Sequence, residues 1–80
     1  MQFQNSHLGT VVERFGTEIA KYAKSGSDHF TVGVDVEIGS SLNNWLLSFG
    51  SEAKILKPDW AAEALLRHID NIKNAYTTKP

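Results

Sequence analysis

The residues best suited to acid–base or metal chemistry in this chain are three histidines, which lie far apart in the sequence. They are His7, His29 and His68. A metal-binding helix usually carries two histidines four residues apart, and none of these has such a neighbour. The serines form no Gly-x-Ser-x-Gly turn, and the glycines form neither a Gly-x-Gly-x-x-Gly loop nor a Gly-Lys-Ser/Thr loop. We therefore expect no catalysis, no metal site and no cofactor.

Four cationic residues remain as candidates for contact with an effector or a phosphate. They are Arg14, Lys21, Lys24 and Lys54. Brought together, they would form a modest basic patch able to hold an acidic ligand or a phosphate backbone. Ordinary solvated surface charge is the alternative interpretation, and it is the one that we favour at this point.

The composition is that of a small folded domain. The chain has 80 residues, a net charge of −1 and no cysteine, so disulfides and thiolate metal sites are excluded. Eight basic residues face nine acidic ones, which argues against nucleic-acid binding by bulk charge. No apolar run approaches the roughly 20 residues of a membrane-spanning helix. We expect a cytoplasmic domain and, because Met1 almost coincides with the first apolar residue, a piece of a longer protein.

Two segments repeat one helical pattern, with apolar residues at positions i, i+3, i+4 and i+7. These residues are Leu8, Val11, Val12 and Phe15 in the first segment, and Leu42, Trp45, Leu46 and Phe49 in the second. The spacing predicts an amphipathic helix in each. Ser6 and Ser40 are the predicted N-cap residues, and Gly16 and Gly50 are the predicted stop residues.

The clearest strand signal is the alternation of apolar and polar residues from Phe30 to Ile38. Its outward positions would be Thr31, Gly33, Asp35 and Glu37. Because none of these is aromatic, this face does not fit an RNA-binding sheet. Residues 17–24 are expected to form a hairpin with this strand across a turn at residues 25–28. Residues 52–56 are predicted to form a further short strand.

A third and longer helix is predicted to begin at Pro58, with Lys57 as its N-cap. Its inward stripe would comprise Leu65, Ile69, Ile72 and Tyr76, with Trp60 and Ala61 before them. Trp45 and Trp60 both lie on apolar stripes, so we expect both to pack in the core.

These elements, in chain order, indicate an α+β fold. Right-handed crossovers give a ferredoxin-like βαββαβ arrangement, which is a four-stranded antiparallel sheet with helices on one face plus an extra C-terminal helix. Enzymes, RNA binders and ligand sensors all use this arrangement, so it assigns no function by itself.

The segment from Trp45 to Gly50, followed by Leu56-Lys57-Pro58, closely resembles the WCX domain, the C-terminal extension of bacterial WYL-domain transcriptional regulators. Members of that family carry Trp-(Ile/Leu)-Leu-x-Phe-Gly, then a short strand ending in Leu-x-Pro, then a helix ending near a tyrosine, here Tyr76. Val12-Glu13-Arg14 and the alternating strand also look like the family, so the resemblance covers nearly the whole chain. Asp59-Trp60 departs from the more common acidic–leucine pair.

The resemblance implies that residues 1–80 form a single regulatory and dimerisation domain, a fragment of a longer regulator. Such a regulator would bind DNA through a helix-turn-helix domain, and this extension would help to form or gate the effector site of an adjacent WYL domain. The resemblance also implies a homodimer, joined through the open sheet face or the last helix. A nucleotide or single-stranded nucleic acid would be the effector, and only Arg14 has a counterpart among the family's cationic contacts.

A stand-alone small-molecule sensor is the alternative that the sequence leaves open. It would resemble the amino-acid-binding domains built on the same fold, which hold ligands between strands and helices beside glycine-rich turns. Gly9 and Gly16 are the only candidates for such turns.

Overall fold

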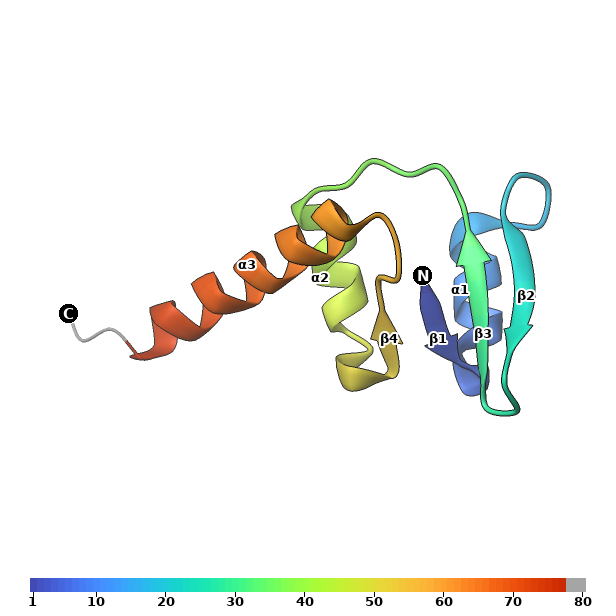
Figure 1. Cartoon of the computed structure of the whole chain (residues 1–80), viewed down its shortest axis with the longest axis horizontal. Helices are drawn as coiled ribbons and strands as arrows, with labels where there is room; N and C mark the ends of the chain where they lie inside the picture. Colours follow the sequence, from blue (N-terminus) through green and yellow to red (C-terminus); the bar gives the residue numbers. More distant parts are fainter. Residues whose placement is uncertain (78–80) are drawn as a thin grey trace.

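Four strands and three α-helices make up residues 1–77, the part of the chain that the computed structural model describes (Figure 1). In chain order they are β1 (Gln2–Gln4), α1 (Leu8–Phe15), β2 (Lys21–Ser25), β3 (His29–Gly33), α2 (Ser40–Leu47), β4 (Ala53–Lys54) and α3 (Asp59–Thr77). Two 3-10 turns are inserted, η1 (Asn5–His7) before α1 and η2 (Gly50–Glu52) before β4. The predicted α+β class is confirmed.

The strands form one sheet in the order β2-β3-β1-β4, and each neighbouring pair is antiparallel. The predicted four-stranded antiparallel sheet and the extra C-terminal helix are therefore confirmed. The chain does not follow the plain βαββαβ pattern, because η1 separates β1 from α1 and η2 separates α2 from β4. These turns let the chain leave each element without a long loop.

One apolar cluster holds the sheet to α1 and α2. Its buried members are Phe3, Val11, Ala20, Phe30, Val32, Leu42, Leu46 and Phe49. Phe3 lies at its centre: its ring is 5.6 Å from that of Phe30, 5.2 Å from that of Phe49 and 5.8 Å from that of Trp45. Because Val11 of α1 and Leu46 of α2 join the same cluster, both helices cover the same face of the sheet.

The strands are shorter than the sequence predicts. β3 ends at Gly33, although the alternation continues to Ile38, because its neighbours end there. Lys21, the first residue of β2, lies opposite Gly33. On the other side, the α-amino group of Met1 donates to the Val32 carbonyl at 2.9 Å, and the Val32 amide donates to the Met1 carbonyl at 2.8 Å. Likewise β4 comprises only Ala53–Lys54, rather than residues 52–56.

The predicted N-caps of the first two helices are wrong. Ser6 lies within η1, so α1 begins only at Leu8. Extended Gly39 takes the cap position of α2, which makes Ser40 its first helical residue, and no side chain caps either helix.

Both predicted stop residues, Gly16 and Gly50, have the left-handed backbone φ that a helix stop favours. Gly16 caps α1 with a φ of 74°. Gly50 also has a positive φ, of 63°, but it starts η2 rather than ending α2 directly. Glycine adopts this left-handed backbone without the strain that a Cβ would add.

Helix α3 departs most from the prediction. It starts at Asp59, and the Pro58 carbonyl accepts the Ala61 amide at 3.1 Å, so Pro58 is the cap rather than Lys57. Figure 1 shows that α3 leaves the sheet beside α2 and extends outward, which gives the molecule dimensions of 47 × 24 × 22 Å. Of its 19 residues only Ala61 is buried.

Candidate functional site

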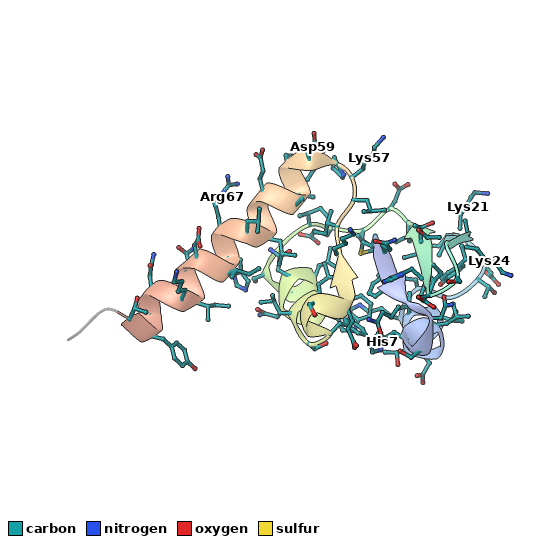
Figure 2. The ribbon with its side chains drawn as sticks, turned by 60° about the horizontal axis from the view of Figure 1, so that its bottom comes forward. His7, Lys21, Lys24, Lys57, Asp59 and Arg67 are labelled. Carbon is teal, nitrogen blue, oxygen red and sulfur yellow. The ribbon has the colours of Figure 1, made fainter. Side chains whose placement is uncertain are left out.

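The four candidate cations do not converge on one surface. Lys21 and Lys24 lie three positions apart on β2, so their side chains leave opposite faces of the sheet. Lys54, on β4, lies opposite Gln2 of β1, and β4 is the edge of the sheet farthest from β2. Three strand spacings of roughly 4.8 Å separate these two edges. Figure 2 shows Lys21 and Lys24 at one end of the molecule, remote from α3.

Arg14 has a different environment, because it lies on α1 against an aromatic side chain. Its guanidinium carbon is 4.7 Å from the centroid of the Trp45 ring, within cation–π range. Trp45 is in turn fixed by the rings of Phe15 at 5.4 Å and Phe49 at 4.9 Å. Among residues 1–77 no carboxylate pairs with Arg14. The arrangement holds the guanidinium in place while leaving its donors available.

An open groove of about 950 Å³ lies beside Arg14, between the end of α1 and the start of α2. Its lining residues are Thr10, Glu13, Arg14, Phe15, Val36, Glu37, Gly39, Ser40, Ser41, Leu42 and Trp45. The uncapped first turn of α2 and the guanidinium both favour an anion. Glu13 and Glu37 oppose a high negative charge. The groove therefore suits a ligand with one phosphate or carboxylate better than a polyphosphate.

The histidines take part in contacts between elements. His7 Nε2 lies 2.8 Å from Glu52 Oε1, an ion pair that joins η1 to η2 when the imidazole is protonated. His68 Nε2 lies 2.7 Å from Asn44 Oδ1 and so joins α3 to α2. Within residues 1–77 no three His, Asp or Glu side chains lie close enough to hold a metal ion. These contacts give both histidines a role in holding the elements together.

An apolar stripe along α3, which the sequence placed in the core, is largely exposed. Ile69 and Ile72 are 39% and 42% exposed, and Tyr76 is 89% exposed. Leu66 adds a further exposed side chain, and only Leu65 packs against the core cluster. The predicted inward orientation holds for Ala61 and Leu65 and is wrong for Ile69, Ile72 and Tyr76, because α3 passes beside α2 and then has no element beneath it.

Trp60 also differs from the prediction. It is 60% exposed, whereas Trp45 packs against the core as expected. Trp60 instead lines an apolar crevice of about 570 Å³, whose other walls are residues 32–36, Ile38 and residues 55–58, together with Met1 and Leu42. Sequence reasoning missed this crevice. Its signal was the alternation continuing to Ile38, which leaves Val36 and Ile38 apolar beyond the end of β3.

Comparison with known proteins identifies the family of the chain. The family model of the WCX domain matches residues 1–72, which includes the sheet, α1, α2 and most of α3. No curated protein and no solved structure matches the chain. No helix within residues 1–77 is both long and apolar enough to cross a membrane. WCX domains are non-catalytic and are found C-terminal to WYL domains in transcriptional regulators. The chain belongs to the WCX domain family.

Proposed function

We propose that this chain is the C-terminal regulatory and dimerisation domain of a cytoplasmic helix-turn-helix regulator, with DNA bound by another domain of the same protein. In this proposal the ferredoxin-like body carries the groove beside Arg14, and α3 carries the surface for a second copy. The exposed apolar stripe of α3 is the observation that supports dimerisation most directly. The family match supports the setting beside a WYL domain.

The spacing of the α3 stripe fits pairing with another helix. Its members are Ala62 and Leu65, which are partly buried in this chain, and Ile69, Ile72 and Tyr76, which are exposed. The intervals alternate between three and four residues, which is the pattern of a coiled-coil seam. The stripe covers about two heptads, so we expect a weak contact on its own, below the roughly 1,200 Å² of a stable interface. Neighbouring domains would strengthen it in a longer regulator.

The charges of α3 favour an antiparallel pair. Asp59, Glu63 and Arg67 give its first half a net charge of −1, whereas Asp70 and Lys73 balance in its second half. A parallel pair would set the two acidic halves together, whereas an antiparallel pair centred near Ile69 sets each acidic half beside a neutral one. The antiparallel arrangement also sets the two helix dipoles in opposite directions, which is favourable.

The open face of the sheet is the weaker candidate for dimerisation. Its side chains are mainly polar, and they belong to Gln2, Gln4, Lys21, Ala23, Ser25, His29, Thr31 and Lys54. Gln2 Nε2 donates to Ser25 Oγ at 2.9 Å on this face. Such a surface is satisfied by water and offers little apolar area to bury.

Sedimentation of the chain over a range of concentrations tests the assembly role. We expect self-association in the wild-type chain and a monomer after Ile72→Glu, because the new carboxylate would be placed in the seam. Asn74→Glu is the matched control: it adds the same charge on the outer side of α3 and should leave association unchanged. A wild-type chain that stays monomeric at millimolar concentration would remove dimerisation through α3 from the proposal.

The effector role rests on the groove beside Arg14. We propose that this groove contributes one cationic contact, the Arg14 guanidinium, for an anionic group of the effector in the site of the adjacent WYL domain, with Trp45 orienting the guanidinium. Lys21, Lys24 and Lys54 stay predictions, since their positions are spread over the sheet. The groove equally supports a stand-alone sensor of a small monoanion, so the two functions need separate tests.

A thermal-shift series with inorganic phosphate, mononucleotides, a short single-stranded DNA and amino acids separates these functions. A ligand present at 100 times its Kd should stabilise the chain by about 2.7 kcal/mol. Stabilisation by an amino acid or mononucleotide, lost in Arg14→Ala and kept in Lys24→Ala, favours a stand-alone sensor. An unchanged response in Arg14→Ala would return Arg14 to the class of ordinary surface charges.

A further inference from the structure

The segment from Val34 to Ile38 has the side-chain pattern of a strand without a neighbouring strand. Val34, Val36 and Ile38 are partly buried and pack against the core cluster, while Asp35 and Glu37 are exposed. The alternation of β3 therefore continues through this segment. It is excluded from the sheet because the strands on both sides end opposite Val32 and Gly33.

The backbone of this segment lacks partners. Within residues 1–77 no backbone hydrogen bond involves residues 34–38. A row of free N–H and C=O groups beside an existing strand is a template for a further strand. A strand that continued β1 backwards from Met1 would lie beside residues 34–38, since Met1 already pairs with Val32 through two hydrogen bonds.

The crevice lined by Trp60 adds a place for side chains. It runs between residues 34–38 and residues 55–58, and most of its lining is apolar. Phe3 and Met1 face the core from alternate positions of the β1 line, and a strand continued in this line would point its next apolar residue at the crevice. Asp35 lies on the open face of the sheet. The third residue before Met1 would lie opposite it, with its side chain on the same face.

We propose that residues 34–38 form a docking edge for an extended strand that lies in line with β1, runs antiparallel to this segment and places apolar side chains in the crevice. The occupant is polypeptide that leads into β1 within a longer chain. This source rests on the proposed function, in which the domain follows others in a regulator. The register follows from the Met1–Val32 pair: the second residue before Met1 lies opposite Val34, and the fourth lies opposite Val36.

The test adds four residues before Met1 of the full 80-residue chain. The extension Val-Lys-Val-Thr places both valines opposite Val34 and Val36 and its lysine opposite Asp35. The control Lys-Val-Thr-Val has the same composition, but a one-residue shift turns its valines to the open face. Backbone amide exchange is measured at Val34 and Val36, whose N–H groups would bond to the added strand.

We expect exchange at these two amides to slow by about tenfold or more in the Val-Lys-Val-Thr chain. The control extension should leave them close to the rate of the unextended chain. Equal rates in all three chains would overturn the docking edge. Equal protection by both extensions would overturn the role of the crevice, and protection by the free Val-Lys-Val-Thr peptide would overturn the in-line source.

The same exchange measurement is repeated in the Ile72→Glu background. Protection that persists there depends on the strand edge and not on association of α3. Retained self-association with intact protection would contradict dimerisation through α3 alone, and loss of self-association together with loss of protection would contradict the docking edge alone.

Discussion

Trp45 and Trp60 illustrate the difference between the two regions of this molecule, the body (residues 1–56) and α3. Each tryptophan lies on an apolar helical stripe. Trp45 contacts three phenylalanine rings and carries a guanidinium on its face, whereas Trp60 is 60% exposed at the start of α3. The spacing of apolar residues shows which of them share a face. It does not show whether that face is covered by the same chain.

The largest expected contrast between the regions is in the free energy of unfolding. Phe3→Ala removes a fully buried ring from the centre of the core and should cost about 3–5 kcal/mol. Tyr76→Ala alters an exposed residue on α3 and should change stability by no more than about 0.5 kcal/mol. Urea denaturation followed by circular dichroism measures both. Similar losses would show that α3 is stabilised as tightly as the body.

The two tryptophans give the next contrast. Trp45→Ala opens a cavity among aromatic rings and should cost about 2–4 kcal/mol, whereas Trp60→Ala should cost less than about 1 kcal/mol. Denaturation curves of the two variants provide the comparison. If Trp60→Ala proved the more destabilising, the crevice at the start of α3 would count as part of the core.

Glycine substitutions probe how α1 is ended within the body. Gly16→Ala forces a Cβ into a backbone with a φ of 74° and should destabilise the domain by about 1 kcal/mol. Gly9→Ala, in the same helix, should stabilise by up to about 1 kcal/mol, because its Cβ would meet no atom within 4 Å and alanine favours helix. Thermal melting of both variants checks the opposite signs. A destabilising Gly9→Ala would contradict this account of α1.

The smallest expected effect concerns the amino terminus of the body. Burial lowers the pKa of the Met1 α-amino group below its usual 8.0, since the charged form is partly desolvated. The unfolded chain then binds more protons between the lowered pKa and 8.0, so stability rises with pH across that interval. Melting temperatures from pH 6 to pH 9 measure this trend. An acetylated amino terminus should remove it, and an identical trend after acetylation would assign it to another group.

The parts of the fold that depend on local pattern could be predicted from the sequence. Both short helices, the hairpin at Gly26 and the glycine with positive φ after Phe15 follow from spacing and from residue conformational preferences. The ends of β3 and the exposure of α3 could not be predicted, because they depend on where other elements stop. Arg14 was a candidate from the sequence, whereas its contact with Trp45 required the packing of α1 against α2.

The contact between His7 and Glu52 has a consequence for how rigidity is distributed in the sheet. It lies at the end of the sheet where β1 leaves into η1, and the Asn5 amide donates to the Asp28 carbonyl at 2.9 Å at the same end. The opposite end carries the crevice and the free backbone of residues 34–38. Contacts between elements thus hold the sheet together at one end only, and its backbone amides should exchange faster toward the opposite end. A segment bound at that end would join the elements there as well. Its binding would stiffen β1 and β4 without moving η1 and η2.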